Sequence, residues 1–140
     1  MKTIFLDFDG VGHPSFHKPS GRFLQFKLLD ECLRPFKKRT ELVISSSWRF
    51  EYSPSELKSL LPKSMGELVV NVTGPAVIGS HARWKEIQAY VSAYGIKDYK
   101  ILDDSRFEFP TTCPELILCD SRTGIKNREI EILESWLANK

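Results

Sequence analysis

The sequence contains few cysteines and no long apolar run. Its three cysteines, Cys32, Cys113 and Cys119, are odd in number and lack Cys-x-x-Cys spacing. They indicate neither a disulfide framework nor a zinc knuckle, and we expect reduced, partly buried thiols. A bilayer-spanning helix needs about 20 consecutive apolar residues, and the sequence has no such stretch. The first apolar run fits a strand better than a signal segment, so we expect a cytoplasmic protein without membrane contact.

Net charge is also small. The formal value of +2 does not by itself argue for a nucleic-acid partner. A hydrophobic content of 41% and a charged content of 27% are typical of a globular domain. The 140 residues can bury one core but not two, so we predict a single domain over residues 1–140. The sequence contains no indication of its oligomeric state.

The most informative stretch lies near the N-terminus. Residues 4–6 form a short apolar run followed by Asp7, Asp9 and Gly10, as in a buried strand of a parallel sheet. Ligands bind beyond the carboxyl ends of such strands. Alternate residues of an extended segment point to one side, so the two carboxylates can share a small volume. This arrangement predicts a divalent metal, an acid with a raised pKa, or both, while an acidic turn is the alternative.

The rest of the chain alternates strand and helix patterns. Residues 11–26, with two prolines and two glycines, indicate an irregular loop or small flap over the end of the first strand. Pro35 should kink or restart the following helix, and residues 53–56 form a capping box with proline at the first helical position. We predict helices at 28–39, 54–61, 83–94 and 127–137, and strands at 42–44, 68–72, 101–102 and 116–119. The alternation predicts a Rossmann-like three-layer α/β fold with a mainly parallel central sheet and a minimal cap.

Polar residues follow three of these strands. They are Asp7 with Asp9, the serines at 45–47, and Asp103 with Asp104. Because parallel strands end at one edge of a sheet, we expect these side chains to converge. His13, His17 and His81 lack ligand spacing, so we predict no metal binding by them. Asp120 and Gly124 fit a turn beside the site.

These residues resemble the motifs of the haloacid dehalogenase (HAD) superfamily of phosphotransferases. Residues 7–10 match its Asp-x-Asp-Gly signature, residues 44–47 resemble its second motif, and residues 102–104 its acidic fourth motif. Arg83 or Lys85 could supply the single basic residue of the third motif. More narrowly, residues 46–49, 83–87 and 102–104 resemble a small HAD subfamily associated with "Swiss army knife" RNA-repair proteins.

The resemblance implies a phosphohydrolase that acts through an aspartyl-phosphate intermediate. Asp7 would attack phosphorus, and Asp9 would protonate the leaving oxygen and later activate water. Ser46, with Ser45 and Ser47 as alternatives, would donate a hydrogen bond to the phosphoryl group. Arg83, or alternatively Lys85, would balance negative charge.

The resemblance also implies a bound Mg2+. Asp7, the backbone carbonyl of Asp9, and Asp103 or Asp104 would hold it, since Mg2+ takes oxygen ligands. We favour Asp104 over Asp103 as the direct ligand because it aligns with the aspartate of the superfamily's Gly-Asp form.

The substrate would be a phosphomonoester, such as a nucleic-acid end or a nucleotide. Ser47, Trp48 and Arg49 are the candidate substrate-binding residues. Trp48 either packs or stacks on a base, and Arg49 either reaches a phosphate or forms an ion pair. A catalytically idle HAD fold that serves as a binding module is the main alternative. A receiver-like signalling domain fits less well, since it predicts a phosphoacceptor on the third strand and a lysine after the fifth.

Overall fold

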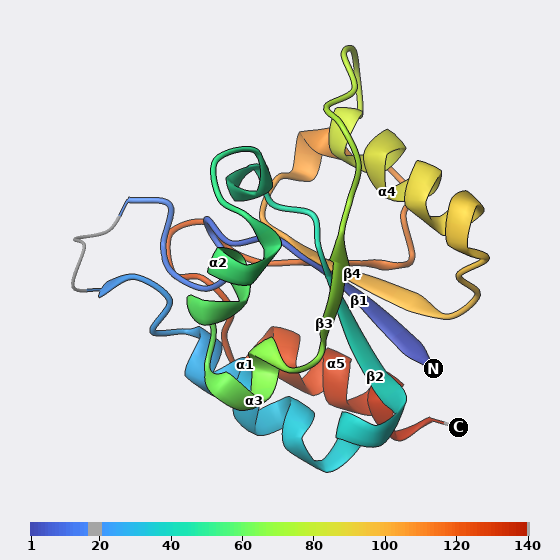
Figure 1. The fold of residues 1–140 in the computed structure, drawn as a ribbon. Helices are drawn as coiled ribbons and strands as arrows, with labels where there is room; N and C mark the ends of the chain where they lie inside the picture. Colours follow the sequence, from blue (N-terminus) through green and yellow to red (C-terminus); the bar gives the residue numbers. More distant parts are fainter. Residues whose placement is uncertain (17–20, 140) are drawn as a thin grey trace.

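The central element is a sheet of five parallel strands. A computed structural model describes residues 1–16 and 21–139. Its strands are β1 (Lys2–Leu6), β2 (Thr40–Ile44), β3 (Val69–Val72), β4 (Tyr99–Asp103) and β5 (Leu116–Leu118). They lie in the order β3-β2-β1-β4-β5, and every neighbouring pair is parallel. This confirms the predicted α/β fold with a parallel central sheet (Figure 1).

Among the described residues, one face of the sheet is covered by the helices α1 (Phe26–Leu33), α2 (Pro54–Ser59), α3 (Lys63–Gly66) and α5 (Asn127–Ala138). Ile4 and Leu6 of β1 belong to the core on this face. Alternate residues of a strand point to opposite faces, so these two side chains share a direction. The helices contribute the remaining apolar side chains of this larger core, among them Phe26, Leu29, Leu33, Leu57, Met65, Ile130, Leu133 and Leu137.

The opposite face carries helix α4 (Ala82–Tyr94) and the short 3-10 helix η4 (Arg106–Glu108). Phe5, the residue between Ile4 and Leu6, points to this side. It packs in a smaller core with Val43, Ile101, Ile87, Tyr90 and Phe109. In Figure 1, α4 lies on one side of the sheet, and α1, α3 and α5 lie on the other. Residues that follow β1 in the Phe5 direction therefore face α4.

The helix ends follow the local sequence signals. Pro35 ends α1 and lies at the start of a 3-10 helix, η2 (Arg34–Arg39), as the predicted restart requires. Ser53 and Glu56 form the predicted capping box of α2. Gly95 ends α4 in the left-handed conformation, with φ of 62°. Helix α3 was not predicted, because its four residues are too few for a periodic pattern.

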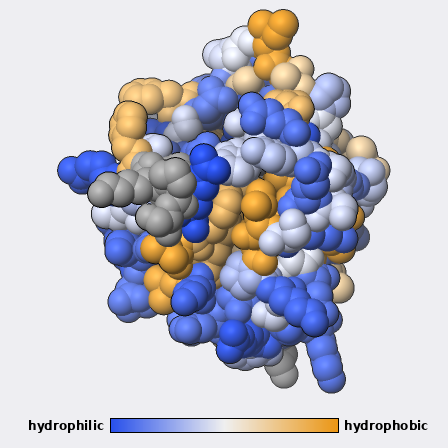
Figure 2. All heavy atoms as spheres, turned by 60° about the vertical axis from the view of Figure 1, so that its left-hand side comes forward, coloured by the Kyte–Doolittle hydropathy of each residue, from blue (hydrophilic) through white to orange (hydrophobic). Residues whose placement is uncertain are grey.

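The segment between β1 and α1 lies beside the end of the sheet. Its described parts, 7–16 and 21–25, consist mainly of turns, with one isolated bridge between Asp9 and His13. The predicted flap over 11–26 falls partly outside the described residues, as does His17. Ser15 donates its backbone N–H to Ser121, and Gln25 donates its amide to Ile125. The predicted turn at 120–124 thus packs against this segment. Figure 2 shows apolar groups among polar ones on this side of the molecule.

The described residues also bear on the thiol and membrane predictions. Cys32 and Cys119 are buried and Cys113 is partly buried, all as free thiols. Burial raises the pKa of Cys32 to about 12. None of the helices formed by residues 1–16 and 21–139 is long and apolar enough to span a membrane.

Gly10 lets the chain turn sharply after β1. Its φ of 78° lies in the left-handed region that favours glycine. A Cβ at this position would overlap the carboxylate of Asp104. Glycine is therefore required both by the backbone conformation and by the close approach of an acidic side chain.

We expect Gly10→Ala to destabilise the fold and to displace Asp104. The left-handed backbone alone costs a non-glycine residue about 1–2 kcal/mol, and the overlap adds to that cost. Urea unfolding of Gly10→Ala and of Gly74→Ala measures the difference, because a Cβ at Gly74 would meet no heavy atom within 4 Å. Equal losses in the two variants would contradict this account of Gly10.

Candidate functional site

The register of the sheet brings three polar residues side by side. Leu6 pairs with Ile44 of β2 and with Leu102 of β4. The next residues along these strands are Asp7, Ser45 and Asp103. Each lies two positions after a residue that faces α4, so its side chain points to the same side of the sheet. The backbone continues the pairing, since Asp7 N–H donates to Leu102 and Ser45 N–H donates to Leu6, both at 3.0 Å.

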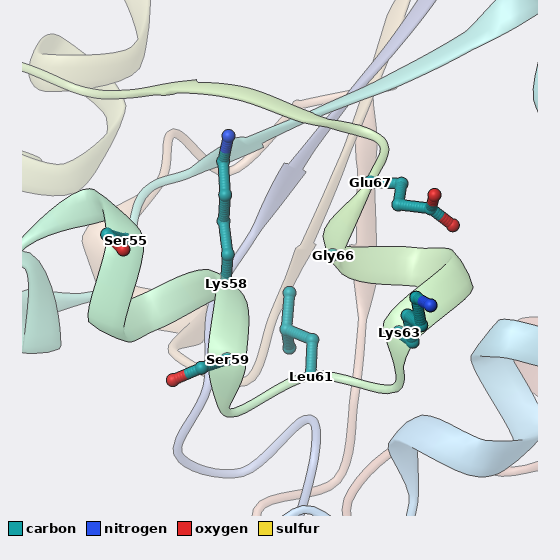
Figure 3. Close-up of a pocket in the computed structure, with 7 residues that line it drawn as sticks. All are labelled: Ser55, Lys58, Ser59, Leu61, Lys63, Gly66 and Glu67. Carbon is teal, nitrogen blue, oxygen red and sulfur yellow. The ribbon is translucent and has the colours of Figure 1, made fainter.

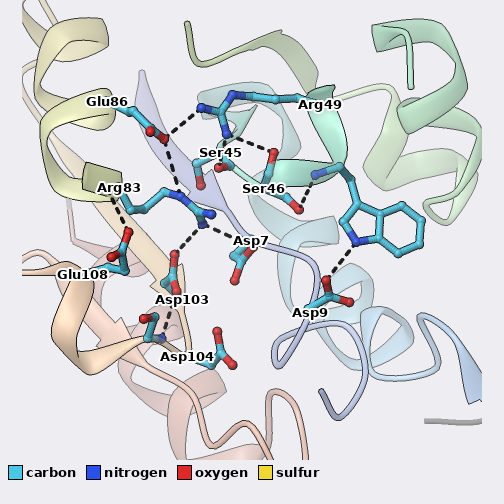
Figure 4. A network of polar contacts seen from close by, with 12 residues as sticks. Asp7, Asp9, Ser45, Ser46, Arg49, Arg83, Glu86, Asp103, Asp104 and Glu108 are labelled. Carbon is cyan, nitrogen blue, oxygen red and sulfur yellow. Dashed lines mark hydrogen bonds and ion pairs between the residues drawn. The ribbon is translucent and has the colours of Figure 1, made fainter. Parts of the chain in front are cut away.

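Arg83 reaches this group from the first turn of α4. Its Nη1 lies 3.3 Å from Oδ1 of Asp7 and 3.0 Å from Oδ2 of Asp103 (Figure 4). Its backbone N–H donates to the Glu108 carboxylate at 3.1 Å, which fixes the start of the helix. Lys85 is exposed, and no ion pair joins it to another described residue. Of the two basic residues left open by the sequence, Arg83 is the one that contacts the acids.

Three carboxylates could hold a metal ion. Asp7, Asp103 and Asp104 each offer an oxygen, and these oxygens lie within 4.8 Å of one another. Asp103 already accepts from Arg83 through Oδ2 and from the Ser105 N–H through Oδ1, both at 3.0 Å. Asp104 is partly exposed and, among the described residues, accepts one long side-chain hydrogen bond, of 3.3 Å, from the Ser15 hydroxyl. An all-oxygen set of this kind suits Mg2+, and Asp104 is better placed than Asp103 to give up a bond for it.

Burial disfavours the ionised forms of Asp7 and Asp103. Burial raises the pKa of Asp7 well above its ordinary value; Asp103 raises it further, and Arg83 opposes both. Burial likewise raises the pKa of Asp103 to about 6, again against the effect of Arg83. One guanidinium therefore does not compensate the buried acids, and a proton or a cation is needed to complete the site.

Asp9 lies apart from this cluster. Its Oδ1 is 2.7 Å from Nε2 of His13, and its Oδ2 accepts a hydrogen bond from Nε1 of Trp48 at 3.0 Å. The Asp9 side chain is 49% exposed, whereas His13 is fully buried. Sequence reasoning considered His13 only as a metal ligand and missed this contact. The sequence does contain a signal for this contact: His13 follows Asp9 by four residues, and Gly10 between them allows the chain to turn back.

The serines after β2 occupy three different environments. The Ser45 hydroxyl is buried and has no hydrogen-bond partner among the described residues. The Ser46 hydroxyl accepts from the Trp48 N–H at 3.2 Å and caps the 3-10 helix η3 (Ser47–Phe50). Ser47 is exposed. Ser45, next to Asp7 in register, is therefore at least as well placed as Ser46 to meet a phosphoryl group.

A cavity of about 340 Å³ adjoins Asp9. Its lining combines aromatic rings, hydroxyl groups and charges, and includes two of the predicted substrate-binding residues. It is lined by Asp9, Arg22, Ser47, Trp48, Glu51 and Tyr52.

Most of the chain matches a known protein family. A family model described as the HAD domain in Swiss Army Knife RNA repair proteins matches residues 3–130. The chain belongs to this family. No curated protein and no solved structure matched. The predicted resemblance is thus confirmed over nearly the whole chain, and Asp7 and Asp9 of the HAD domain lie in the matched region.

Within this HAD domain, Arg49 takes one of the two roles that the sequence left open for it. Its guanidinium is buried and donates to the carbonyls of Ser45, Ser46 and Gly74 and to Oε1 of Glu86 at 2.8 Å. Arg49 therefore forms the ion pair that was the alternative to phosphate contact. It joins the loop after β2 to helix α4, and Glu86 lies 3.7 Å from Nε of Arg83.

A larger cavity, of about 490 Å³, lies between α2 and α3 (Figure 3). It is lined by Ser55, Lys58, Ser59, Leu61, Lys63, Gly66 and Glu67. None of these residues belongs to the acid cluster, so size alone does not locate the chemistry.

We expect the stability of the metal-free protein to fall as pH rises. A carboxyl whose pKa is raised by folding contributes stability that is complete below its unfolded pKa and is lost as pH passes the folded value, about 6 for Asp103. Without Mg2+, Asp7→Asn should raise Tm at about pH 7.5 by roughly 3–5 °C for each 1 kcal/mol gained. The gain should shrink at about pH 5, where the acids are protonated, and on addition of Mg2+. Thermal unfolding with Asp120→Asn, an exposed acid, as control checks this; an unchanged pH dependence would contradict it.

We expect Arg49→Leu to destabilise the protein by about 3–5 kcal/mol, because the buried Glu86 carboxylate loses its shorter ion pair, at 2.8 Å, and keeps the longer contact with Arg83. Adding Glu86→Gln should recover part of the loss. Arg122→Leu, which removes an exposed ion pair with Asp120, should cost no more than about 1 kcal/mol. Urea unfolding measures all of these variants, and a similar cost for Arg49→Leu and Arg122→Leu would show that the buried pair has no special weight.

Proposed function

We propose that the protein is a Mg2+-dependent phosphohydrolase that acts on a phosphomonoester through an aspartyl-phosphate intermediate. The observation that carries the proposal is the buried Asp7 carboxylate, bridged by Arg83 to Asp103 at the carboxyl edge of the sheet. Membership of the HAD family supports the same chemistry. A buried carboxylate with a paired guanidinium is a suitable nucleophile for phosphorus.

Asp7 and Asp9 divide the chemistry between them. A carboxylate oxygen of Asp7 attacks phosphorus while the bond to the leaving oxygen breaks, and Asp9 gives that oxygen a proton. Asp9 then takes a proton from water as the water attacks the aspartyl-phosphate, which releases inorganic phosphate and restores Asp7. Asp9 thus returns to its protonated form at the end of each cycle.

Arg83 and a serine hydroxyl would stabilise the phosphoryl group. Arg83 balances negative charge between Asp7 and the phosphoryl oxygens. Ser45, or Ser46 with its hydroxyl proton still available, donates to a phosphoryl oxygen. Both serines follow β2 directly, so their backbone is held by the sheet.

The donor set fits Mg2+. Asp7, the backbone carbonyl of Asp9, and Asp104 with or without Asp103 would hold the ion, in line with the 4.8 Å cluster of carboxylate oxygens. When bound, Mg2+ neutralises charge on the acids and polarises the phosphoryl group. Its charge would also favour the ionised, nucleophilic form of Asp7.

A nucleic-acid end or a nucleotide is the proposed substrate class. The family's description mentions RNA repair, and the cavity beside Asp9 has aromatic and cationic lining. Ser47 and Arg22 are exposed there and could contact the leaving group. Reduced cysteines fit a cytoplasmic location, which remains part of the proposal.

The strand order argues against the receiver-like alternative. Receiver domains have the flavodoxin-like order 2-1-3-4-5, whereas this sheet has the order β3-β2-β1-β4-β5. The acids that would accept a phosphoryl group follow β1, at the centre of the sheet. The arrangement suits turnover at β1 rather than storage of a phosphoryl group on the third strand.

We expect Mg2+-dependent release of phosphate from a panel of 5′- and 3′-phosphorylated oligonucleotides, nucleotides and phosphopeptides. Asp7→Asn should abolish it, since no other residue replaces the nucleophile. Arg83→Met should lower kcat/KM by roughly 10²-fold or more, whereas Lys85→Met should change it little. Loss of activity in Lys85→Met but not in Arg83→Met would reverse the assignment. Tight RNA binding without phosphate release would favour the idle binding module instead.

A further inference from the structure

We propose that His13 and Trp48 are positioning residues that hold the Asp9 carboxylate for its acid/base work. This inference rests on the proposed function of Asp9. The two side chains donate to opposite oxygens of the same carboxylate, Oδ1 and Oδ2. They come from different parts of the chain, one after the Gly10 turn and the other after β2.

The hydrogen bond at the other ring nitrogen sets the tautomer of His13. The backbone N–H of Phe23 donates to Nδ1 of His13 at 3.1 Å, so Nδ1 carries no proton in this arrangement. The ring proton therefore lies on Nε2, which donates to Asp9 at 2.7 Å. His13 acts here as a donor that orients Asp9, and the proton given to the leaving oxygen is the one that Asp9 carries.

The backbone of Phe23, which donates the hydrogen bond to Nδ1 of His13, is strained. Its φ of 62° places a bulky residue in the left-handed region, which costs about 1–3 kcal/mol and persists only when its surroundings enforce it. The Phe23 ring packs 4.8 Å from His13 and 5.1 Å from Trp48, measured between ring centres. The same packing that enforces the strained backbone aims its N–H at His13.

Neighbouring aromatic rings also hold the indole of Trp48 in place. Its indole packs against Phe8 and Phe23 and stacks on Tyr52, with ring centres 5.4 Å apart. The guanidinium of Arg22 lies 5.5 Å from the centre of the indole ring. The ring is thus fixed by its neighbours and presents Nε1 to Asp9. Trp48 therefore packs, which is one of the two roles that the sequence left open for it, and its partly exposed ring also lines the cavity beside Asp9.

The two donors restrict Asp9 without blocking it. A carboxylate oxygen can accept more than one hydrogen bond, so each can still carry or receive a proton. Half of the Asp9 side chain is exposed toward solvent, and the residue lines the cavity of about 340 Å³. Asp9 is therefore oriented at the point where a leaving group would enter, which is what general acid catalysis requires.

Leaving-group dependence tests the inference. A good leaving group such as p-nitrophenolate needs little protonation, whereas an alkoxide depends on the general acid. We therefore expect Trp48→Phe, which keeps the packing but removes Nε1–H, to lower kcat/KM about tenfold or more for an alkyl phosphate and less than about twofold for p-nitrophenyl phosphate. His13→Phe should act in the same way, and His13→Gln, which retains a donor near Nε2, should restore part of the activity.

Trp136→Phe is the matched control. It also removes an indole N–H that donates to a carboxylate, Asp98 at 2.8 Å, but outside the site. We expect no change in the ratio of the two kcat/KM values. Equal losses for both substrates in Trp48→Phe and His13→Phe would overturn the positioning role, because a general loss of folded protein lowers both rates alike.

A measurement without turnover separates this inference from the proposed function. The Trp48 indole N–H resonance, identified by its loss in Trp48→Phe, should shift in Asp9→Asn by more than the resonances of Trp84 and Trp136. If the resonance shifts but the protein has no phosphatase activity, the proposed function is refuted. The hydrogen bond between Trp48 and Asp9 then exists but has no catalytic role. No shift, in a protein that does release phosphate, would refute the contact alone.

Discussion

The site is governed by the crowding of buried carboxylates around one guanidinium. Parallel register places Asp7 beside Asp103, and Asp104 follows directly. Arg83 bridges the first two, yet burial still raises the pKa of both. A set of groups that cannot all be charged in isolation is stable only with a proton or a cation. The same crowding of negative charge would favour the binding of a divalent ion.

Arg83 in turn depends on a chain of contacts that reaches across the sheet. Glu86 lies between Arg83 and Arg49, and Arg49 donates to carbonyls in the loop after β2 and in the loop after β3. The basic residue that faces the acids and the serines beside Asp7 are therefore parts of one network. Burial of Arg49 costs solvation, and the four hydrogen bonds that it donates offset that cost.

The parallel α/β architecture and the residues at strand ends could be predicted from the sequence, because both follow from local patterns. Alternation of strand and helix predicts a parallel sheet, and such a sheet must bring Asp7, the serines and Asp103 to one edge. The partners of these residues could not be predicted in the same way. His13 meets Asp9 only because the chain turns at Gly10, and Arg49 meets Glu86 only because α4 packs over β2. Contacts of this kind depend on tertiary packing, which leaves no periodic trace in the sequence.

Side chains of β1 alternate between the two faces of the sheet, and this alternation limits which insertions and deletions the protein can tolerate. Phe5 and Asp7 face α4, whereas Ile4 and Leu6 face the other core. Insertion or deletion of a single codon within β1, β2 or β4 would turn the following polar residue toward the opposite, apolar core. The three central strands should therefore keep their lengths, and so should the short stretch from Asp7 to His13, whose spacing brings His13 to Asp9.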